Sequence, residues 1–233
     1  MGKMGNLSKH RRGGVADDMD TSDWKETYKI ARYTGKFTID EMDLVDDRFG
    51  ALENTSPGAM GDAAAALRPN LVYYHLLANA ALGADSVALF DASTHANYGT
   101  TGTALASATL QAAIATMGKQ RMQKRPLNIA PRYLLVPQDL RFLAEILLTS
   151  AERVVSSSDG TKNPLLGTGI QIIFDDRLGV AGVTDPASGT AQAGTATNWF
   201  LVAKPGEAGA KTIEVGYLRG KGRVPQIRSY TLD

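Results

Sequence analysis

The sequence of 233 residues contains no cysteine, and only 7% of its residues are aromatic. The absence of cysteine excludes a disulfide framework, a thiolate metal site and a cysteine nucleophile. No apolar run reaches the roughly 18 residues that a membrane-spanning helix needs. The basic residues 1–14 are not followed by the apolar segment of a signal peptide. We therefore expect no signal peptide and no membrane partner.

The chain also lacks an excess of either charge, because 25 basic and 24 acidic residues leave a net charge of +1. A domain that binds duplex DNA usually carries a strong basic surplus, whereas low net charge suits a body that packs against many copies of itself. Hydrophobic residues make up 43% of the chain, enough for a core, and the 24 glycines favour turns and strand ends over a helical bundle. The fold class predicted is α+β.

Catalytic signatures are missing as well. The hydrolase motif Gly-x-Ser-x-Gly, the phosphate-binding loop and the dinucleotide fingerprint do not occur. His95 follows Asp91 by four residues, and this pair is the best candidate for an acid/base or metal site. Two ligands are too few for a closed zinc site. We expect a structural contact there, with no catalytic residue, no metal and no cofactor.

Proline and glycine positions predict where the first long helix lies. Ser56 followed by Pro57 is typical of a helix start, and Gly83 is typical of a stop. These residues predict a helix over residues 56–82. Pro69 removes a hydrogen bond inside it, so a kink or a break is expected just before that residue.

Two shorter helices are expected over residues 104–123 and 137–151. In the second of these, apolar residues at helical spacing are predicted to face the core: Leu140, Leu143, Ile146 and Leu147. Short runs of alternating or continuous apolar residues predict strands. These runs are 28–32, 37–39, 133–136, 170–174, 199–203, 212–218 and 224–230.

The first 35 residues are highly charged and poor in large apolar side chains, so they cannot fold alone. A basic block is followed by an acidic block. The sequence admits a solvated tail or a charged loop that lies on a neighbouring subunit. In the second case the candidate intersubunit contacts are Lys9, Arg11, Arg12, Asp17, Asp18, Asp20 and Asp23.

A second basic region lies near the C-terminus. It comprises Lys204, Lys211, Arg219, Lys221, Arg223 and Arg228. Only Tyr217 and Tyr230 lie among them, whereas a platform for single-stranded nucleic acid usually carries more stacking residues. A solvated or intersubunit strand face is the favoured interpretation.

Several segments, in this order and spacing, resemble one known family. They are YTGKF (33–37) with DDRFGA (46–51), GDAAA (61–65) with NLVY (70–73), VALFD (87–91) with HAN (95–97), PLNIAPRYLLVP (126–137), WFLVA (199–203) and IEVGYL (213–218). From about residue 24 onward the chain is similar to the Mu-like phage major head proteins. That family also occurs fused behind a Clp-type prohead protease.

The resemblance implies the "HK ninety-seven" capsid fold of tailed phages. It assigns an extended loop to residues 1–35, a peripheral domain with a long spine helix to 36–98, an axial domain with a central sheet flanked by helices to 99–197, and returning strands to 198–233. Pro69 is unusual in a spine helix.

The function implied is that of a structural major capsid protein, and not of an enzyme. Such a subunit self-assembles through pentamers and hexamers into the icosahedral head shell around double-stranded DNA. The implied partners are further copies, the portal, a scaffold or prohead protease, a decoration protein and, non-specifically, packaged DNA. The implied location is the virion, after assembly in the host cytoplasm.

Three alternatives remain open at this point. An encapsulin-like nanocompartment shell would share the fold but enclose protein cargo. A nucleic-acid-binding module would use the basic C-terminal strands. An enzyme would use Asp91 and His95.

Replacement of Asp17, Asp18 and Asp20 by lysine is expected to impair particle formation and to leave the fold of the subunit intact, because charged blocks select which surfaces meet. Electron microscopy measures the particles, and circular dichroism measures the fold. Normal particles from this variant would refute the assigned role of the acidic block.

Overall fold

The structure is a computed structural model. It describes residues 29–47, 50–99, 103–122, 125–153, 161–206, 213–219 and 224–226, together with Lys9, Thr27 and Arg228. The helices are α1 (Glu41–Asp46), α2 (Ala51–Ala78), α3 (Ser107–Gly118) and α4 (Arg141–Thr149), with short 3-10 helices η1 (Gln138–Leu140) and η2 (Asp176–Leu178). The strands are β1 (Arg121–Met122), β2 (Arg125–Pro126), β3 (Pro131–Val136), β4 (Glu152–Arg153), β5 (Thr161–Lys162), β6 (Gln171–Phe174), β7 (Val183–Thr184), β8 (Ala191–Gln192) and β9 (Phe200–Ala203). Helices and strands are mixed, as the sequence predicts.

The centre of the fold is a three-stranded sheet in the order β6-β3-β9. Strand β3 runs parallel to β6 and antiparallel to β9. The three strands correspond to the predicted strands 133–136, 170–174 and 199–203, so these predictions are confirmed. Three antiparallel two-stranded pairs, β1-β2, β4-β5 and β7-β8, surround the sheet.

Both faces of this sheet are covered, because successive side chains of a strand point to opposite sides. Leu134 and Val136 are fully buried in a core with Leu110 of α3 and with α4. Leu135, between them, packs on the other side, in a cluster with Tyr73 of α2 and residues of η2 and β7. Strand β3 therefore contributes side chains to two hydrophobic cores, one on each face of the sheet.

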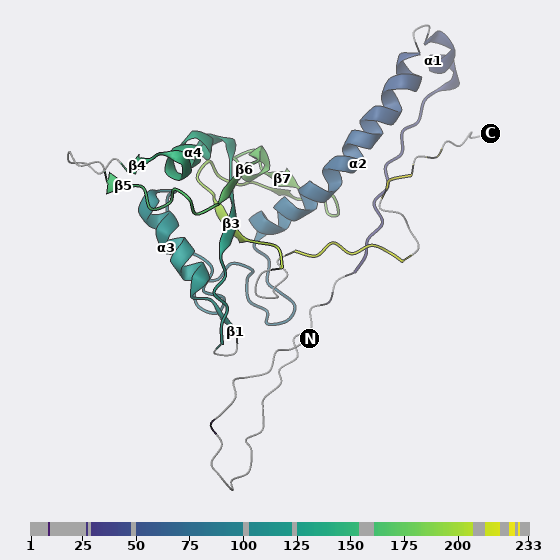
Figure 1. The fold of residues 1–233 in the computed structure, drawn as a ribbon. Helices are drawn as coiled ribbons and strands as arrows, with labels where there is room; N and C mark the ends of the chain where they lie inside the picture. Colours follow the sequence, from purple (N-terminus) through teal and green to yellow (C-terminus); the bar gives the residue numbers. More distant parts are fainter. Residues whose placement is uncertain are drawn as a thin grey trace.

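Helix α2 is about 42 Å long at 1.5 Å per residue. Only its C-terminal half packs against the central domain. Its N-terminal half and α1 stand clear of that domain (Figure 1). Most described side chains from residue 55 to 65 of this half are exposed.

The bounds predicted for this helix are wrong. Gly50 starts α2 in a left-handed conformation at φ 62°, and the helix passes through Pro57 and Pro69 without a break. Each proline costs the helix one backbone hydrogen bond and crowds the preceding turn, and the remaining bonds of the 28-residue helix keep it continuous. The helix ends early because Asn79, at φ 46°, turns the chain and exchanges two hydrogen bonds with the backbone of Phe90, at 2.6 and 3.1 Å.

The set of residues predicted to face the core from α4 is also partly wrong. Ala144 and Leu148 are its buried residues, whereas Leu143 is 39% and Ile146 is 61% exposed. This helix is apolar on two sides, so helical spacing alone cannot select the side that meets the core. The first turn, after Pro137, is a 3-10 turn. The helix predicted over residues 104–123 is shorter, since the chain continues into the β1-β2 pair.

The strands predicted near the two ends are not present among the described residues. Residues 29–40 and 213–218 have no regular secondary structure, and neither do residues 224–226. They nevertheless expose large apolar side chains, among them Ile30, Phe37 and Ile213. The remainder of the predicted strands lies outside the described residues. The predicted division into extended loop, peripheral and axial parts stays a prediction.

Candidate functional site

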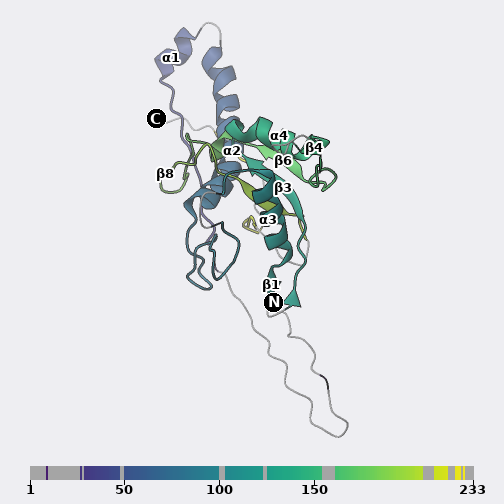
Figure 2. The ribbon, with the colours of Figure 1, turned by 90° about the vertical axis from the view of Figure 1, so that its left-hand side faces the viewer.

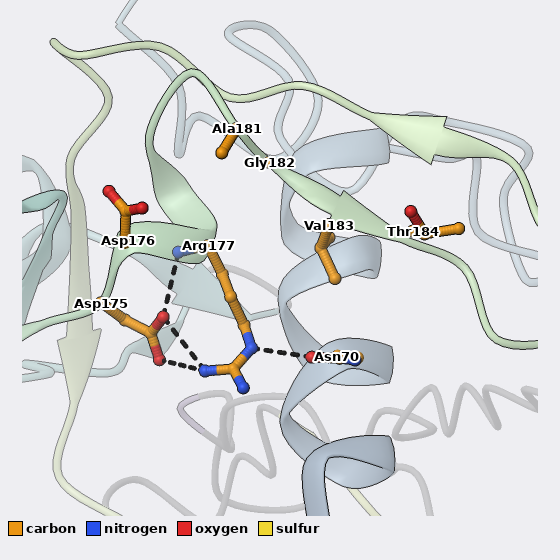
Figure 3. Close-up of a pocket in the computed structure, with 8 residues that line it drawn as sticks. All are labelled: Asn70, Asp175, Asp176, Arg177, Ala181, Gly182, Val183 and Thr184. Atoms are coloured by element: carbon orange, nitrogen blue, oxygen red, sulfur yellow. Dashed lines mark hydrogen bonds and ion pairs between the residues drawn. The ribbon is translucent and has the colours of Figure 1, made fainter. Parts of the chain in front are cut away.

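The junction between α2 and the central domain is built around Arg177 of η2 (Figure 3). Its Nε donates to Oδ1 of Asn70 on α2 at 2.7 Å. Its Nη1 donates to both carboxylate oxygens of Asp175, at 2.9 and 3.2 Å. Charge-assisted bonds of this kind are stronger than neutral ones. One side chain thereby ties the long helix to the edge of the sheet.

The local sequence explains why Arg177 lies there. Asp175 follows β6 directly and caps η2, because its Oδ1 accepts from the backbone N–H of Arg177 at 3.0 Å. The same carboxylate therefore starts the turn and orients the guanidinium. An open hollow of about 430 Å³ lies beside them, lined by residues of η2, β7 and α2. Among the charged residues that line it, Asp175 and Arg177 are paired with each other.

Tyr73, on α2, completes this junction. It is 9% exposed and its hydroxyl donates to Asp175. Burial first, and then the negative charge and hydrogen bond of Asp175, raise the pKa of Tyr73 to about 12. The guanidinium of Arg177 lies 6.0 Å from the ring centroid and partly offsets this effect. The phenol is therefore a neutral donor across the working pH range.

Close backbone contact holds the β7-β8 pair to the same corner. Gly194 donates to the carbonyl of Gly179 at 3.1 Å, and Thr195 donates to that of Leu178 at 3.2 Å. A Cβ at Gly194 would collide with the carbonyl of Leu178, so only glycine allows this approach.

The loop between α2 and α3 contains His95, but its partner is not the predicted one. His95 Nε2 lies 2.8 Å from Oδ2 of Asp85, and Nδ1 lies 2.8 Å from the carbonyl oxygen of Ala88. Asp91 instead accepts from the backbone and hydroxyl of Ser93, at 2.9 and 3.0 Å. The predicted contact between Asp91 and His95 side chains is wrong, because the carboxylate of Asp91 accepts from the backbone two and three residues ahead, at Ser93 and Thr94.

The geometry determines the charge of His95. The carbonyl of Ala88 and the carboxylate of Asp85 both accept hydrogen bonds, so both ring nitrogens donate and the imidazolium fits best. The hydrogen bond with Asp85 is the main cause that raises the pKa of His95. The pKa of Asp85 is lowered, first by the N–H of Val87 and then by His95. The pair is a structural clip.

Further bonds fix the loop to the rest of the domain. Gln120 Nε2 donates to the carbonyls of His95 and Ala96, each at 3.1 Å. Asn97 Nδ2 donates to the carbonyl of Leu89 at 2.8 Å. The loop is therefore a folded connector, held to the rest of the domain by these bonds.

Of the predicted intersubunit residues, only Lys9 is described, and it is exposed. Arg11, Arg12, Asp17, Asp18, Asp20 and Asp23 lie outside the described residues. In the basic C-terminal region Lys204, Arg219 and Arg228 are exposed, and the other three cations are not described.

Neither a metal site nor a membrane span is found in the described residues. They contain no group of three or more histidine, aspartate or glutamate side chains that could hold a metal ion. Within the same part of the chain, each helix is too short or too polar to cross a bilayer.

The junction was missed by sequence reasoning. Asn70 and Arg177 are 107 positions apart. Asn70 belongs to the segment NLVY (70–73), but nothing in that segment points to Arg177. Asp175 lies at a terminus, since it is the N-cap of η2. The contact between Arg177 and Asn70 becomes visible only when the fold brings α2 and η2 together.

Comparison with known proteins gives one family and one fold. Residues 25–233 match the family described as phage capsid protein. A similar solved structure is a chain from the capsid of bacteriophage JBD30 decorated with minor capsid protein trimers. The two chains are 19% identical, the match covers 75% of this chain and 83% of the other, and the TM-score is 0.53. No curated protein matches the chain.

Titration of the phenols tests the α2 junction. One of the eight tyrosines should ionise near pH 12, and Tyr73→Phe should remove that transition. Asp175→Asn should lower the pKa of Tyr73, although burial keeps it above 10. The pKa of Tyr73 is higher in the folded protein than in the unfolded chain. Tyr73 therefore leaves the stability of the fold unchanged below pH 10, and it lowers that stability as the pH rises from 10 to 12. Ultraviolet absorbance measures this, and the absence of a transition near pH 12 in the wild type would contradict the geometry.

NMR titration of His95 tests the loop clip. Asp85→Asn should bring the pKa of His95 down towards its ordinary value, whereas the matched Asp91→Asn should leave it raised. The pKa of His95 is higher in the folded protein than in the unfolded chain. His95 therefore stabilises the fold fully when the pH is below its pKa in the unfolded chain, and this stabilisation is lost as the pH rises through its pKa in the folded protein. The contribution of Asp85, whose pKa is lowered, disappears as pH falls through its folded pKa. The opposite ranking of the two variants would restore Asp91 as the partner.

Proposed function

Because the chain belongs to the phage capsid protein family and is a tailed-phage major capsid protein, we propose that it self-assembles into the icosahedral head shell that encloses double-stranded DNA. The shell is built from pentamers and hexamers of this chain. Assembly needs no chemical step. Many weak contacts that form at once make the particle stable, because each engaged contact raises the effective concentration of the next.

One observation carries this proposal: large apolar side chains are exposed along two segments outside the sheet. In residues 29–45 they include Phe37, Met42 and Val45, at 54%, 75% and 76% exposure. In residues 213–224 they include Ile213 and Val224, at 51% and 77%. Exposed apolar side chains that gather in this way are typical of interaction surfaces. Neighbouring subunits in a shell are the partners that would cover it.

The shape of the subunit suits this role. We assign α2, which projects from the central domain, to the spine of a peripheral domain of the HK ninety-seven type. The sheet with α3 and α4 then corresponds to the axial domain. Arg68 lies 5.8 Å from the ring centroid of Tyr217, so the C-terminal segment returns to the side of α2. This mapping supports the predicted order of parts along the chain.

The remaining predicted partners follow from the same role. The portal, a scaffold or prohead protease and a decoration protein would meet this chain in the shell. The solved capsid of bacteriophage JBD30 carries minor capsid protein trimers. The net charge of +1 fits weak, salt-sensitive contact with packaged DNA. The charged block from Lys9 to Asp23 remains our candidate for contact with a neighbouring subunit.

Negative-stain electron microscopy of the purified chain, alone and with its co-expressed partners, tests self-assembly. We expect closed particles tens of nanometres across, or pentamers and hexamers, since these are the building units of such shells. Protein cargo in place of DNA inside the particles would favour an encapsulin-like compartment. A monodisperse monomer or dimer under every condition would overturn the proposal.

A further inference from the structure

We propose that the outward face of α4 binds a second copy of this chain in the shell, with Phe142, Ile146 and Phe174 as the anchoring side chains. This inference rests on the proposed function and names one surface through which it operates. The surface comprises these three residues with Leu143, Arg141 and Glu145, and is called the α4 patch.

The α4 patch is the opposite of what a surface helix normally presents. Phe142 is 72% exposed, Ile146 is 61% exposed, and Phe174, at the end of the adjacent β6, is 40% exposed. A helix at the surface of a soluble domain usually turns charged or polar residues outward. Helix α4 already buries Ala144 and Leu148 in the core, so the outward apolar residues are not needed for its own packing. In both overall views α4 lies along the border of the central domain (Figures 1 and 2).

Arg141 orders this surface before any partner arrives. Its guanidinium lies 4.2 Å from the ring centroid of Phe174 and 6.0 Å from that of Phe142. Its Nε donates to Oε1 of Glu145 at 3.2 Å. The cation therefore links the two aromatic rings, and less side-chain freedom is lost on binding. Aromatic residues with arginine are the composition that interface centres favour.

Charge argues for a second copy as the occupant. The cation of the α4 patch is paired with Glu145, so the patch has no net charge of its own. Each subunit carries only +1, so two copies can approach without strong repulsion. DNA or a strongly charged scaffold would be recognised through an unmatched cation cluster, which the patch does not provide.

The size and symmetry are also consistent with a repeated contact. The apolar area exposed is on the order of 400 Å², which is near the largest patch on a typical monomer. Alone it is too small for a stable dimer, but a ring repeats the contact at every subunit. In a ring of five or six copies the contact is head-to-tail. The patch of one subunit therefore meets a different surface of the next.

The test compares two variants for assembly. Phe142→Ser with Ile146→Ser removes the anchors, and Val180→Ser removes a side chain of 70% exposure elsewhere as the matched control. We expect the double variant to need at least a tenfold higher subunit concentration to assemble, with an unchanged circular dichroism spectrum. The control should assemble as the wild type does. Light scattering and sedimentation measure the threshold.

The outcomes separate this inference from the proposed function. Wild-type chain that never assembles overturns both. Equal assembly of the wild type and the double variant overturns the α4 contact alone, as does loss of only decoration or scaffold binding. Should the double variant misfold, carbene footprinting of wild-type protein decides: Phe142 labelling should fall several-fold on assembly. Unchanged labelling in the finished shell would refute the contact.

Discussion

Leu134, Leu135 and Val136 point alternately to two hydrophobic cores, and the rest of the described fold is arranged around this short stretch of β3. The side facing Leu134 and Val136 holds α3 and α4. The side facing Leu135 holds the C-terminal half of α2 with η2 and β7. A strand buried on both faces loses stability whichever side is disturbed, because cavities form in close-packed interiors. The long helix is thus coupled to the same strand that organises the sheet.

Polar contacts then fix the position of α2 relative to the sheet more precisely than apolar packing alone does. Arg177 links Asn70 on α2 to Asp175 at the end of β6, and Tyr73 bonds to the same carboxylate. These contacts fix where the projecting helix leaves the domain. A shell subunit requires this, since a small change of angle at the base of α2 becomes a large displacement at its far end. In the proposed shell, the large apolar residues that this subunit exposes would contact its neighbours.

Much of the central domain was predictable, because the strands around Leu134, Ile172 and Leu201 are short apolar runs bounded by turn residues. The ends of α2 were not, since Gly50 and Asn79 act through left-handed backbone conformations that spacing does not reveal. The inward face of α4 was predicted wrongly, because Leu143 and Ile146 are apolar but exposed. The Arg177 junction joins residues over a hundred positions apart, which one sequence cannot pair. The family, in contrast, was identified correctly from ordered motifs such as residues 126–137.

The central claim is that one subunit is a folded core whose outer segments are completed by other subunits. Hydrogen exchange of the free subunit and of the assembled shell tests it most directly, because exchange reports local opening residue by residue. The account predicts that β3 is protected in both states, whereas residues 29–40 and 213–219 become protected only in the shell. Equal protection of those two segments in the free subunit and in the shell would contradict it.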